Sequence, residues 1–429
     1  MPDEFFSAEQ LTRLRRLWDN QQNLDEVVTF LTKTHLKLPL SEMEPSLAEE
    51  WVRFQVEVAF REKAFLVVEV AVKLLLNTHS SSLKPSTSAY LLNQLGVSLG
   101  YRGSFHKAIN CYERQLQIAY DLDDHAMVAL TLNNLALNHM YLGSIPKAQA
   151  LLQDGLKQVQ RLVDQRQRAD LEGALRTNLA EMNWRTGLFE DALDELAQVD
   201  ELIRSAGLDQ VEELELVAEK NEIYVKAYIS LGRIVEAYEV VAALGKMNFD
   251  DHSLFGLLHK LRAEGYYRWK AEGNHQAAVE CFLETLETAI RVEAGEYIFV
   301  TQLFLASGIV DGIQAGTLDA STCIRMLDTT TQRVLLFAKL QNYPGILAET
   351  VLFRAKFFLA THQVMLAYHL LVEATRLIAD HDLHHLNERY EAVKGEVVAL
   401  MDDQPQSNDD LDLTSLKYYL EQLQSVLSS

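Results

Sequence analysis

Three histidines near the end of the chain are the residues best suited to metal chemistry. His381, His384 and His385 stand beside Asp380 and Asp382. If this stretch is helical, His381 and His385 lie one turn apart, where two imidazoles could share a zinc ion. The same segment is also typical of a turn between two helices, in which an aspartate caps the second helix by accepting from its free N–H groups. Because the spacing fixes no third ligand, we predict a capped turn and no metal site.

The three cysteines are the next candidates for chemistry. Cys111, Cys281 and Cys323 lie far apart and form no CxxC pair, which argues against a zinc ribbon and favours a reducing compartment. Cys111 and Cys281 directly precede Tyr112 and Phe282 in equivalent places of a repeat, so packing accounts for both. The sequence also contains no HExxH, GxSxG, P-loop or GxGxxG motif. We predict a protein that is not an enzyme and that binds no cofactor.

The charge of the chain argues against nucleic-acid partners. Its 429 residues include 39 Lys and Arg and 61 Asp and Glu, a net charge of −22, which repels phosphate backbones. The basic clusters in residues 13–16 and 157–168 are interpreted as solvated helix faces. The acidic stretch of residues 190–222 is interpreted in the same way, or alternatively as a docking surface for a basic partner.

Hydropathy gives no sign of a membrane segment. The longest apolar stretch without a charged residue covers residues 297–310, which is shorter than the roughly 20 residues that a membrane helix needs. The first residues do not combine a basic segment with an apolar run, so no secretory signal is visible. We therefore expect a cytoplasmic protein with no membrane partner.

A ladder of small residues recurs along the chain and predicts the elements that would carry any binding site. From Gly96, the ladder continues at Gly103, Ala108 and Tyr112, at offsets of 7, 12 and 16 residues. Further copies comprise Ala136, Gly143, Ala148 and Leu152; Ala180, Gly187, Ala192 and Leu196; Val225, Gly232, Ala237 and Val241; Tyr266, Gly273, Ala278 and Phe282; and, more weakly, Ala355, His362, Ala367 and Leu371. One copy is missing from this series and would centre on residues 316–318.

Each copy of the ladder predicts a helical hairpin. Apolar residues at helical spacing precede the glycine, which ends the first helix in a left-handed conformation that costs glycine nothing sterically. The alanine allows the axis of the second helix to approach the first closely, and the following tyrosine or leucine fills the remaining space. A chain with only 19 glycines and 7 prolines has few other tight turns, which also disfavours an all-β fold.

This pattern of Leu-Gly, Gly, Ala and Tyr resembles the tetratricopeptide repeat, although its period exceeds the usual length of about 34 residues. Residues 131–136, with the sequence TLNNLA, are similar to the subclass found in kinesin light chains, MalT-type sensor domains and Rap-like regulators. The resemblance implies an all-α fold: a right-handed α-solenoid of about nine helical hairpins with a C-terminal amphipathic helix.

We predict five regions along the chain. They are N-terminal helical hairpins in residues 1–85, a regular array in residues 86–290, degenerate repeats in residues 291–400, an acidic linker in residues 401–412 and an amphipathic helix in residues 413–429. The last helix carries leucines on one face, so it either caps the final repeat or docks in a groove of this chain, of a second copy or of a partner.

In this repeat family the first helix of each hairpin faces the concave side, and the resemblance therefore implies that ligands bind there. Three recurring slots of that helix hold Asn93, Val97 and Gly100 in the first clear repeat. The candidate residues for binding a peptide or partner are Asn93, Tyr101, Asn133, Asn134, Met140, Tyr141, Asn178, Glu181, Trp184, Lys226 and Tyr267.

The asparagines in this set allow two interpretations. An amide side chain offers both a donor and an acceptor, which matches a peptide group, and peptide-sensing relatives in the family use asparagines in this way. The alternative is that the asparagines bond neighbouring helices to one another. The residue types do not decide between the two.

Our leading hypothesis is a non-enzymatic scaffold or adaptor that binds a peptide or helix of a partner protein in the concave groove. A ligand-sensing regulator that resembles the MalT-type or Rap-like proteins is one alternative. A structural subunit of a larger complex is another, and the C-terminal helix would then serve as its tether or allow self-association.

Overall fold

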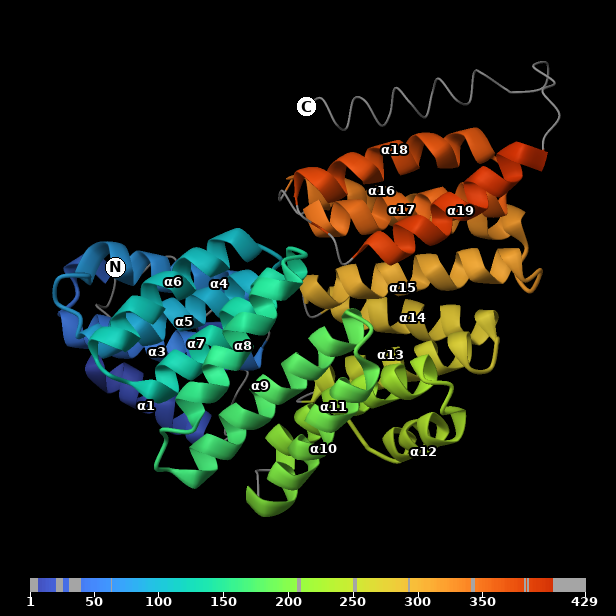
Figure 1. Ribbon diagram of the computed structural model, residues 1–429. Coiled ribbons are helices and arrows are strands. Elements are labelled where there is room, and N and C mark those ends of the chain that lie inside the picture. The colour runs from blue at the N-terminus through green and yellow to red at the C-terminus, as the bar shows by residue number, and fades with distance from the viewer. Residues whose placement is uncertain are drawn as a thin grey trace.

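The computed structural model describes residues 7–20, 26–30, 40–62, 64–206, 210–249, 253–291, 294–340, 344–381, 383 and 386–403. All regular secondary structure in these ranges is helical, and successive helices pack in pairs that stack side by side into an α-solenoid (Figure 1). The predicted all-α solenoid is thereby confirmed.

The helices follow one another in a simple order. The N-terminal part contains α1 (Ala8–Asp19), the 3-10 helix η1 (Leu40–Glu42), α3 (Pro45–Arg61) and α4 (Phe65–His79), and residues 26–30 are also helical. The helix pairs are then α5 (Pro85–Tyr101) and α6 (Phe105–Asp121); α7 (His125–Tyr141) and α8 (Ile145–Val159); α9 (Gln165–Arg185) and α10 (Phe189–Ala206); α11 (Gln210–Ser230) and α12 (Ile234–Gly245); α13 (Leu254–Lys270) and α14 (His275–Arg291); α15 (Gly295–Gln314) and α16 (Ala320–Leu340); and α17 (Pro344–Ala360) and α18 (Val364–Asp380). Helix α19 (Asn387–Asp403) follows the last pair.

The turn inside each of these pairs contains one residue with a positive φ. Glycines with φ between 64° and 83° occupy this place at Gly103, Gly143, Gly187, Gly232, Gly273 and Gly316. In the last pair the residue is His362, with a φ of 60°. The ladder thus located the hairpin turns correctly, including the weak copy with histidine and the missing copy near residue 316.

The alanine of the ladder lies where the two helices of a pair meet. It has no exposed surface at Ala108, Ala148, Ala192, Ala237, Ala278 and Ala367. Across the first of these interfaces, a Cβ atom added to Gly96 would lie only 2.6 Å from the ring of Tyr112. Small side chains therefore let the paired helices approach as closely as the sequence pattern predicts.

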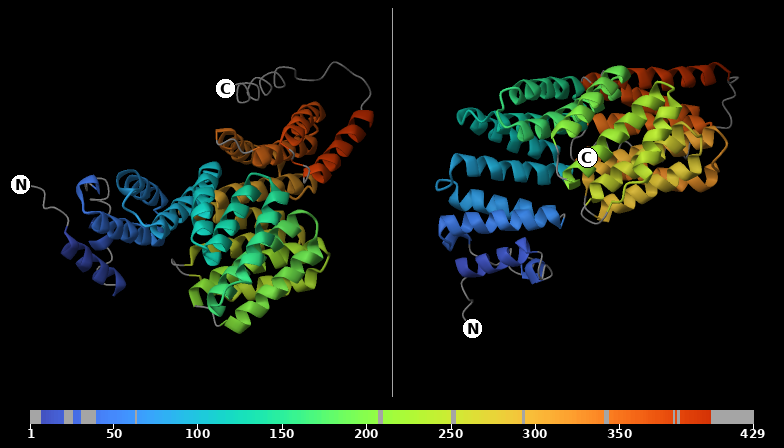
Figure 2. Two further views of the ribbon diagram at one scale, coloured as in Figure 1. Left: turned by 60° about the vertical axis from the view of Figure 1, so that its left-hand side comes forward. Right: turned by 90° about the horizontal axis from the view of Figure 1, so that it is seen from below.

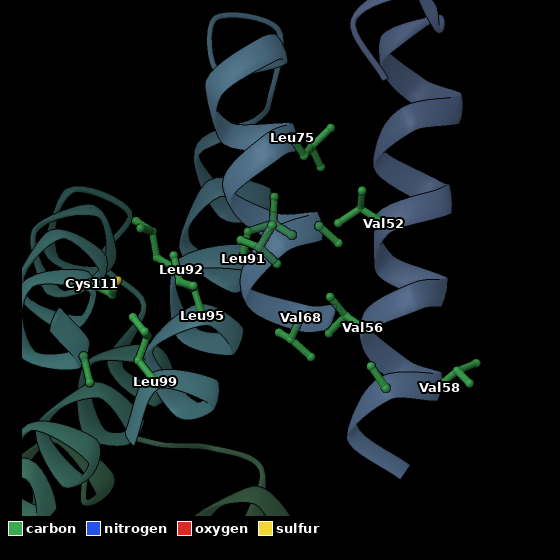
Figure 3. Close-up of a cluster of buried hydrophobic side chains, with 14 of the residues drawn as sticks. Val52, Val56, Val58, Val68, Leu75, Leu91, Leu92, Leu95, Leu99 and Cys111 are labelled. Carbon is green, nitrogen blue, oxygen red and sulfur yellow. The ribbon is translucent and has the colours of Figure 1, made fainter. Parts of the chain in front are cut away.

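The core of the N-terminal part continues from one helix to the next without interruption. Figure 3 shows Val52 and Val56 of α3 next to Val68 and Leu75 of α4, with Leu91 of α5 on the side of α4 that faces away from α3. All five belong to one buried cluster. Each helix pair therefore buries its apolar face against its neighbours rather than within a separate domain.

The superhelix turns far enough to bring late helices against early ones. Ile346 of α17 belongs to the same buried cluster as Leu142, which follows α7. A Cβ atom added to Gly345 would lie 2.9 Å from the Cα atom of Gly143. Figure 2 shows the teal helices of the early repeats lying against the orange and red helices of the late ones. The inner side of the solenoid is thus partly closed by the chain itself.

Several predictions about the ends of the chain are not tested by the structure. Residues 404–429, which include most of the predicted acidic linker and the whole predicted C-terminal helix, lie outside the described residues. Helix α19 extends to Asp403, so the linker's first three residues are helical. The boundaries predicted at residues 85 and 290 stay predictions. Within the described ranges, no helix is both long and apolar enough to span a membrane.

Candidate functional site

A cavity of about 460 Å³ lies where the early and late helices meet. Its wall is made by the C-terminal ends of α7, α9 and α13 on one side and by α15, α17 and the first half of α19 on the other. Residues more than 200 positions apart, such as Met140 and Leu352, therefore line one space. Ligand sites in proteins commonly fall in this range of volume.

Aromatic rings form much of the cavity wall. Trp184 of α9 meets Tyr266 of α13 edge to face, with ring centroids 6.1 Å apart, and Tyr266 packs against Trp269 at 5.7 Å. Phe304 of α15 continues the row at 5.8 Å from Tyr266. Burial raises the pKa of Tyr266 to about 12, so its hydroxyl stays protonated at neutral pH. Rings in this arrangement give large and rigid contact area to an apolar ligand group.

Charged side chains surround the aromatic wall at its edge. Lys270 donates to Asp311 Oδ2 at 2.8 Å, and Trp269 Nε1 donates to the same oxygen at 3.0 Å. Arg389 of α19 lies 3.8 Å from a carboxylate oxygen of Glu349. These contacts join α13 to α15 and α17 to α19 within the cavity lining.

Behind Trp184, a row of buried charges runs along the inner faces of the middle helices. Glu181 of α9 pairs with Arg185 of the same helix and with Lys226 of α11, each at 2.8 Å. Lys226 Nζ also lies 4.6 Å from the centre of the Trp184 ring. Burial raises the pKa of Glu181, but Lys226 and Arg185 outweigh burial and hold that pKa below its ordinary value. The carboxylate is therefore charged and helps fix Trp184 through Lys226.

The row continues deeper at Glu222 of α11, whose side chain is 2% exposed. Its carboxylate lies 3.1 Å from Lys226, 2.7 Å from His259 Nδ1 and 2.6 Å from Arg262. Burial raises the pKa of Glu222, and Arg262, Lys226 and His259 together hold it well below its ordinary value. Although Glu222 ends the acidic stretch that was expected to be solvated, it is therefore a buried ion pair.

His259 completes this network without being free for catalysis. Its Nδ1 faces Glu222, and its Nε2 lies 2.8 Å from the hydroxyl of Tyr297. In the tautomer that carries its proton on Nδ1, His259 donates to Glu222, and its Nε2 accepts a hydrogen bond from the Tyr297 hydroxyl, which satisfies both nitrogens. We interpret His259 as a bridge between α11, α13 and α15.

The predicted asparagines bond to one another across neighbouring repeats. Asn134 donates to Asn93 Oδ1 at 3.0 Å, and Asn178 donates to Asn133 Oδ1 at 2.9 Å. These bonds match the second interpretation, in which the amides join neighbouring helices. None of the four lines the cavity.

The other predicted binding residues divide between the cavity and its surroundings. Met140, Tyr141 and Trp184 line it. Tyr101 instead stacks between Phe65 and Phe255, with centroid distances of 4.8 Å and 5.1 Å, and so ties α4 and α5 to α13. The remaining residue, Tyr267, packs in another buried cluster between α11, α12 and α13.

Sequence reasoning missed the late side of the cavity, although a usable signal was present. The three recurring slots correspond to Leu352, Lys356 and Leu359 in the weak copy around Ala355. Leu352 and Lys356 do line the cavity. Extending the slot assignment to this copy would therefore have found part of the site. No slot identifies the α19 residue Arg389, because that helix follows the last copy of the ladder.

The structure leaves the histidine cluster largely untested. His384, His385 and Asp382 lie outside the described residues, and the described part of the chain contains no group of three or more side chains suited to hold a metal. Burial raises the pKa of the Cys111 thiol, and it raises the pKa of the Cys281 thiol to about 11. Both shifts disfavour the reactive thiolate and agree with a packing role.

Comparison with known proteins gives a family for part of the chain. Residues 87–161 match a family model described as tetratricopeptide repeat. A Rap protein complexed with competence and sporulation factor is similar in structure, at 14% identity, over 92% of this chain and 99% of that chain, with a TM-score of 0.48. A Signal Transduction ATPase with Numerous Domains protein with a tetratricopeptide repeat sensor, from Pyrococcus horikoshii, is similar at 15% identity, over 92% of this chain and 55% of that chain, with a TM-score of 0.36. No curated protein matches the sequence.

Proposed function

We propose that this chain, in which residues 87–161 match a tetratricopeptide repeat model, is a non-enzymatic interaction protein that binds a short peptide segment of a partner in the cavity between α7, α9, α13, α15, α17 and α19. The observation that carries the proposal is the aromatic wall of Trp184, Tyr266 and Trp269. It faces a cavity whose lining also includes Met140 and Tyr141, which were predicted from the sequence together with Trp184.

The energetics favour side-chain pockets over backbone contacts as the source of affinity. Micromolar binding requires about 8 kcal/mol. Four hydrogen bonds to a peptide backbone contribute only about 2–6 kcal/mol net, and the inner asparagines already bond to one another. Burial of one or two large apolar side chains against the aromatic wall supplies the remainder at about 1.5–3 kcal/mol each.

The proposal is tested by filling the cavity. Ser307 of α15 is a small, buried lining residue, so Ser307→Leu should obstruct the space while the outer surface stays unchanged. The native protein is mixed with a random pentapeptide pool and separated from free peptide by size exclusion. We expect a defined subset of the peptides to elute with the protein, as identified by mass spectrometry. Ser307→Leu should lose that subset, and Trp184→Ala should weaken retention.

The matched control is Tyr238→Ala, which removes a 57% exposed aromatic ring from the outer helix α12. It should retain the same peptides as the native protein. Circular dichroism confirms that every variant is folded. Retention that is equal in native protein and in both cavity variants, or absent altogether, would contradict peptide binding at this site.

A second candidate function is a ligand-sensing regulator, and one observation favours it. The cavity lies between helices of the early repeats and helices of the late ones, next to the close contact between Gly143 and Gly345. A ligand there touches both parts, so its binding energy acts on how tightly the superhelix closes. Small-angle scattering with the retained peptides distinguishes the two functions: a change in radius of gyration indicates a regulator, and an unchanged curve indicates an adaptor.

A further inference from the structure

A second groove lies between α14 and α16, the outer helices of two consecutive pairs. Its volume is about 460 Å³, and Leu305 of α15, which has no exposed surface, lies at its base. Leu283 and Leu286 of α14 line one wall, and Met326 of α16 lines the other. Leu283 is 37% exposed, so part of this apolar surface is open to solvent. The groove is separate from the cavity described above, because the two share no lining residue.

The α16 wall of this groove is basic, although the protein as a whole is acidic. Arg325 and Arg333 line the groove and are exposed, and neither has a carboxylate within ion-pair distance in the described ranges. The sequence of α16 contains these two arginines and Lys339 against a single acidic residue, Asp328. The groove therefore combines an apolar base with two positive charges at its edge.

The segment that follows α19 has the complementary pattern. Residues 404–412 contain three aspartates and no basic residue. Residues 413–427 then place leucines at helical spacing on one face, at positions 413, 416, 420, 423 and 427. Both stretches lie outside the described residues. A leucine stripe preceded by acidic residues matches an apolar groove bordered by arginines in both hydrophobicity and charge.

The capping of the last helix pair, which was the other role considered for residues 413–429, is already provided by α19. Val393 and Val397 of α19 are each 1% exposed and belong to the same buried cluster as Leu371 and Ile378 of α18. Terminal repeats need one such covering element. The leucine stripe of residues 413–427 therefore requires a different apolar surface.

The groove lies within reach of the end of α19. Both α19 and α16 pack against α17. Because packed helices lie about 8–10 Å apart, roughly 20 Å separate the axes of α19 and α16. The nine residues 404–412 span at most about 30 Å when extended. Figure 1 shows α19 ending on the same side of the molecule as the turn from α15 to α16, which is the side from which Arg325 is reached first.

We propose that residues 413–427 dock as a helix in the groove between α14 and α16 of their own chain, with the leucines against Leu283, Leu286 and Met326 and the aspartates beside Arg325. A helix of this length measures about 22 Å and passes both arginines, which are about 12 Å apart along α16. The short tether holds the segment at an effective concentration of about a millimolar, so a modest affinity keeps the groove occupied. This inference concerns the outer surface and does not rest on the proposed function.

Hydrogen exchange of the full chain, followed by mass spectrometry, tests the docking. We expect the amides of residues 413–427 to exchange at least about tenfold more slowly than those of a synthetic peptide of residues 404–429, because a docked helix keeps its N–H groups bonded. Leu283→Asp places a charge in the groove and should remove this protection. Leu66→Asp, at a 52% exposed leucine of α4, is the matched control and should preserve it.

Charge reversal tests the role of the arginines. Arg325→Glu combined with Arg333→Glu should reduce the protection by about threefold, in line with exposed ion pairs. Arg161→Glu combined with Arg166→Glu, at two exposed arginines between α8 and α9, changes the net charge equally and should have no effect. High salt should weaken the effect of the groove arginines but not that of Leu283→Asp. If circular dichroism shows that Leu283→Asp does not fold, the arginine variant takes its place, because both arginines are exposed.

The outcomes separate this site from the other surfaces that could hold the segment. Protection that is independent of protein concentration and lost in the groove variants supports the proposal. Absence of protection in the native chain overturns it, and so does protection that survives in the folded groove variants. Loss of protection in Tyr368→Asp alone would place the segment on the exposed side of α18, where that ring is 42% exposed. Protection that rises with concentration, together with a dimer in light scattering, would assign the groove to the segment of a second copy.

Discussion

The inner faces of the early and middle repeats use different chemistry to join one repeat to the next. Between α5, α7 and α9, the bonds run from amide to amide, as in Asn178 to Asn133. Between α9, α11 and α13, they run between full charges, as in Lys226 to Glu181 and Arg262 to Glu222. The bonded partners in both regions are 40 to 45 residues apart, which is one repeat.

The comparison shows that the inner face of the repeat can join neighbouring helices either through neutral amide pairs or through buried ion pairs. A neutral amide pair that loses one partner leaves a single unsatisfied polar group. A buried ion network that loses one partner leaves an uncompensated charge, which is far more costly. The middle repeats should therefore be the more sensitive part of the solenoid. They are also the part that supports Trp184 at the cavity.

The largest expected effect is that of Glu222→Gln. This substitution keeps the shape of the side chain but leaves Lys226 and Arg262 buried with one anion fewer, so we expect a loss of roughly 3–5 kcal/mol in the free energy of unfolding. Denaturant unfolding followed by circular dichroism measures it. The pKa of Glu222 is lowered by folding, so its contribution is present above its ordinary pKa and is lost as the pH falls through the lowered value. The variant should lack this part of the acid sensitivity.

Glu219→Gln is the matched control for that substitution. Glu219 lies on the same helix, and burial raises its pKa, as do the nearby charges of Glu222 and Glu181. Removal of its charge relieves repulsion, so stability should stay unchanged or rise. Equal losses in the two variants would contradict the assignment of the ion network to Glu222.

The local part of the fold was open to prediction from the sequence, and the closure of the superhelix was not. Gly316 and His362 could be assigned to hairpin turns because the steric demand of a positive φ is a property of one residue in one turn. The buried alanines followed from contacts within a single pair of helices.

The cavity depends instead on small rotations between repeats, which accumulate along the solenoid. Whether Leu352 of α17 lines the same cavity as Met140 of α7 is decided by the sum of these rotations over more than 200 residues. No local pattern encodes that sum. Among the predicted residues, Met140, Tyr141 and Trp184 lie on the early side of the cavity, and none lies on its late side.

A smaller effect is expected in the early repeats. Asn178→Ala leaves the Oδ1 atom of Asn133 without its donor, and both residues are 7% exposed. We expect a loss of about 1–3 kcal/mol. The Asn134 and Asn93 pair is only part-buried, so Asn134→Ala should cost less.

A double-mutant cycle on Asn133 and Asn178 measures the coupling directly, and it should be near 1 kcal/mol. Peptide retention in these variants should match that of the native protein, because neither residue lines the cavity. Loss of retention without loss of stability would show instead that the amides bind ligand.

The smallest expected effect concerns the hairpin turns and has the opposite sign. The early turns place glycine at the residue with positive φ, whereas the last pair places His362 there, with a φ of 60°. A left-handed conformation costs a residue with a Cβ atom about 1–2 kcal/mol, which glycine avoids, although glycine loses more entropy on folding. His362→Gly should therefore raise the free energy of unfolding by about 1 kcal/mol or less.

Gly187→Ala is the converse substitution in an earlier turn. Nothing lies within 4 Å of a Cβ atom added there and φ is 81°, so this variant should lower the free energy of unfolding through the backbone alone. If His362→Gly were destabilising, the histidine would have to make a contact that outweighs the conformational strain, and the last turn would differ from the glycine turns in more than residue type.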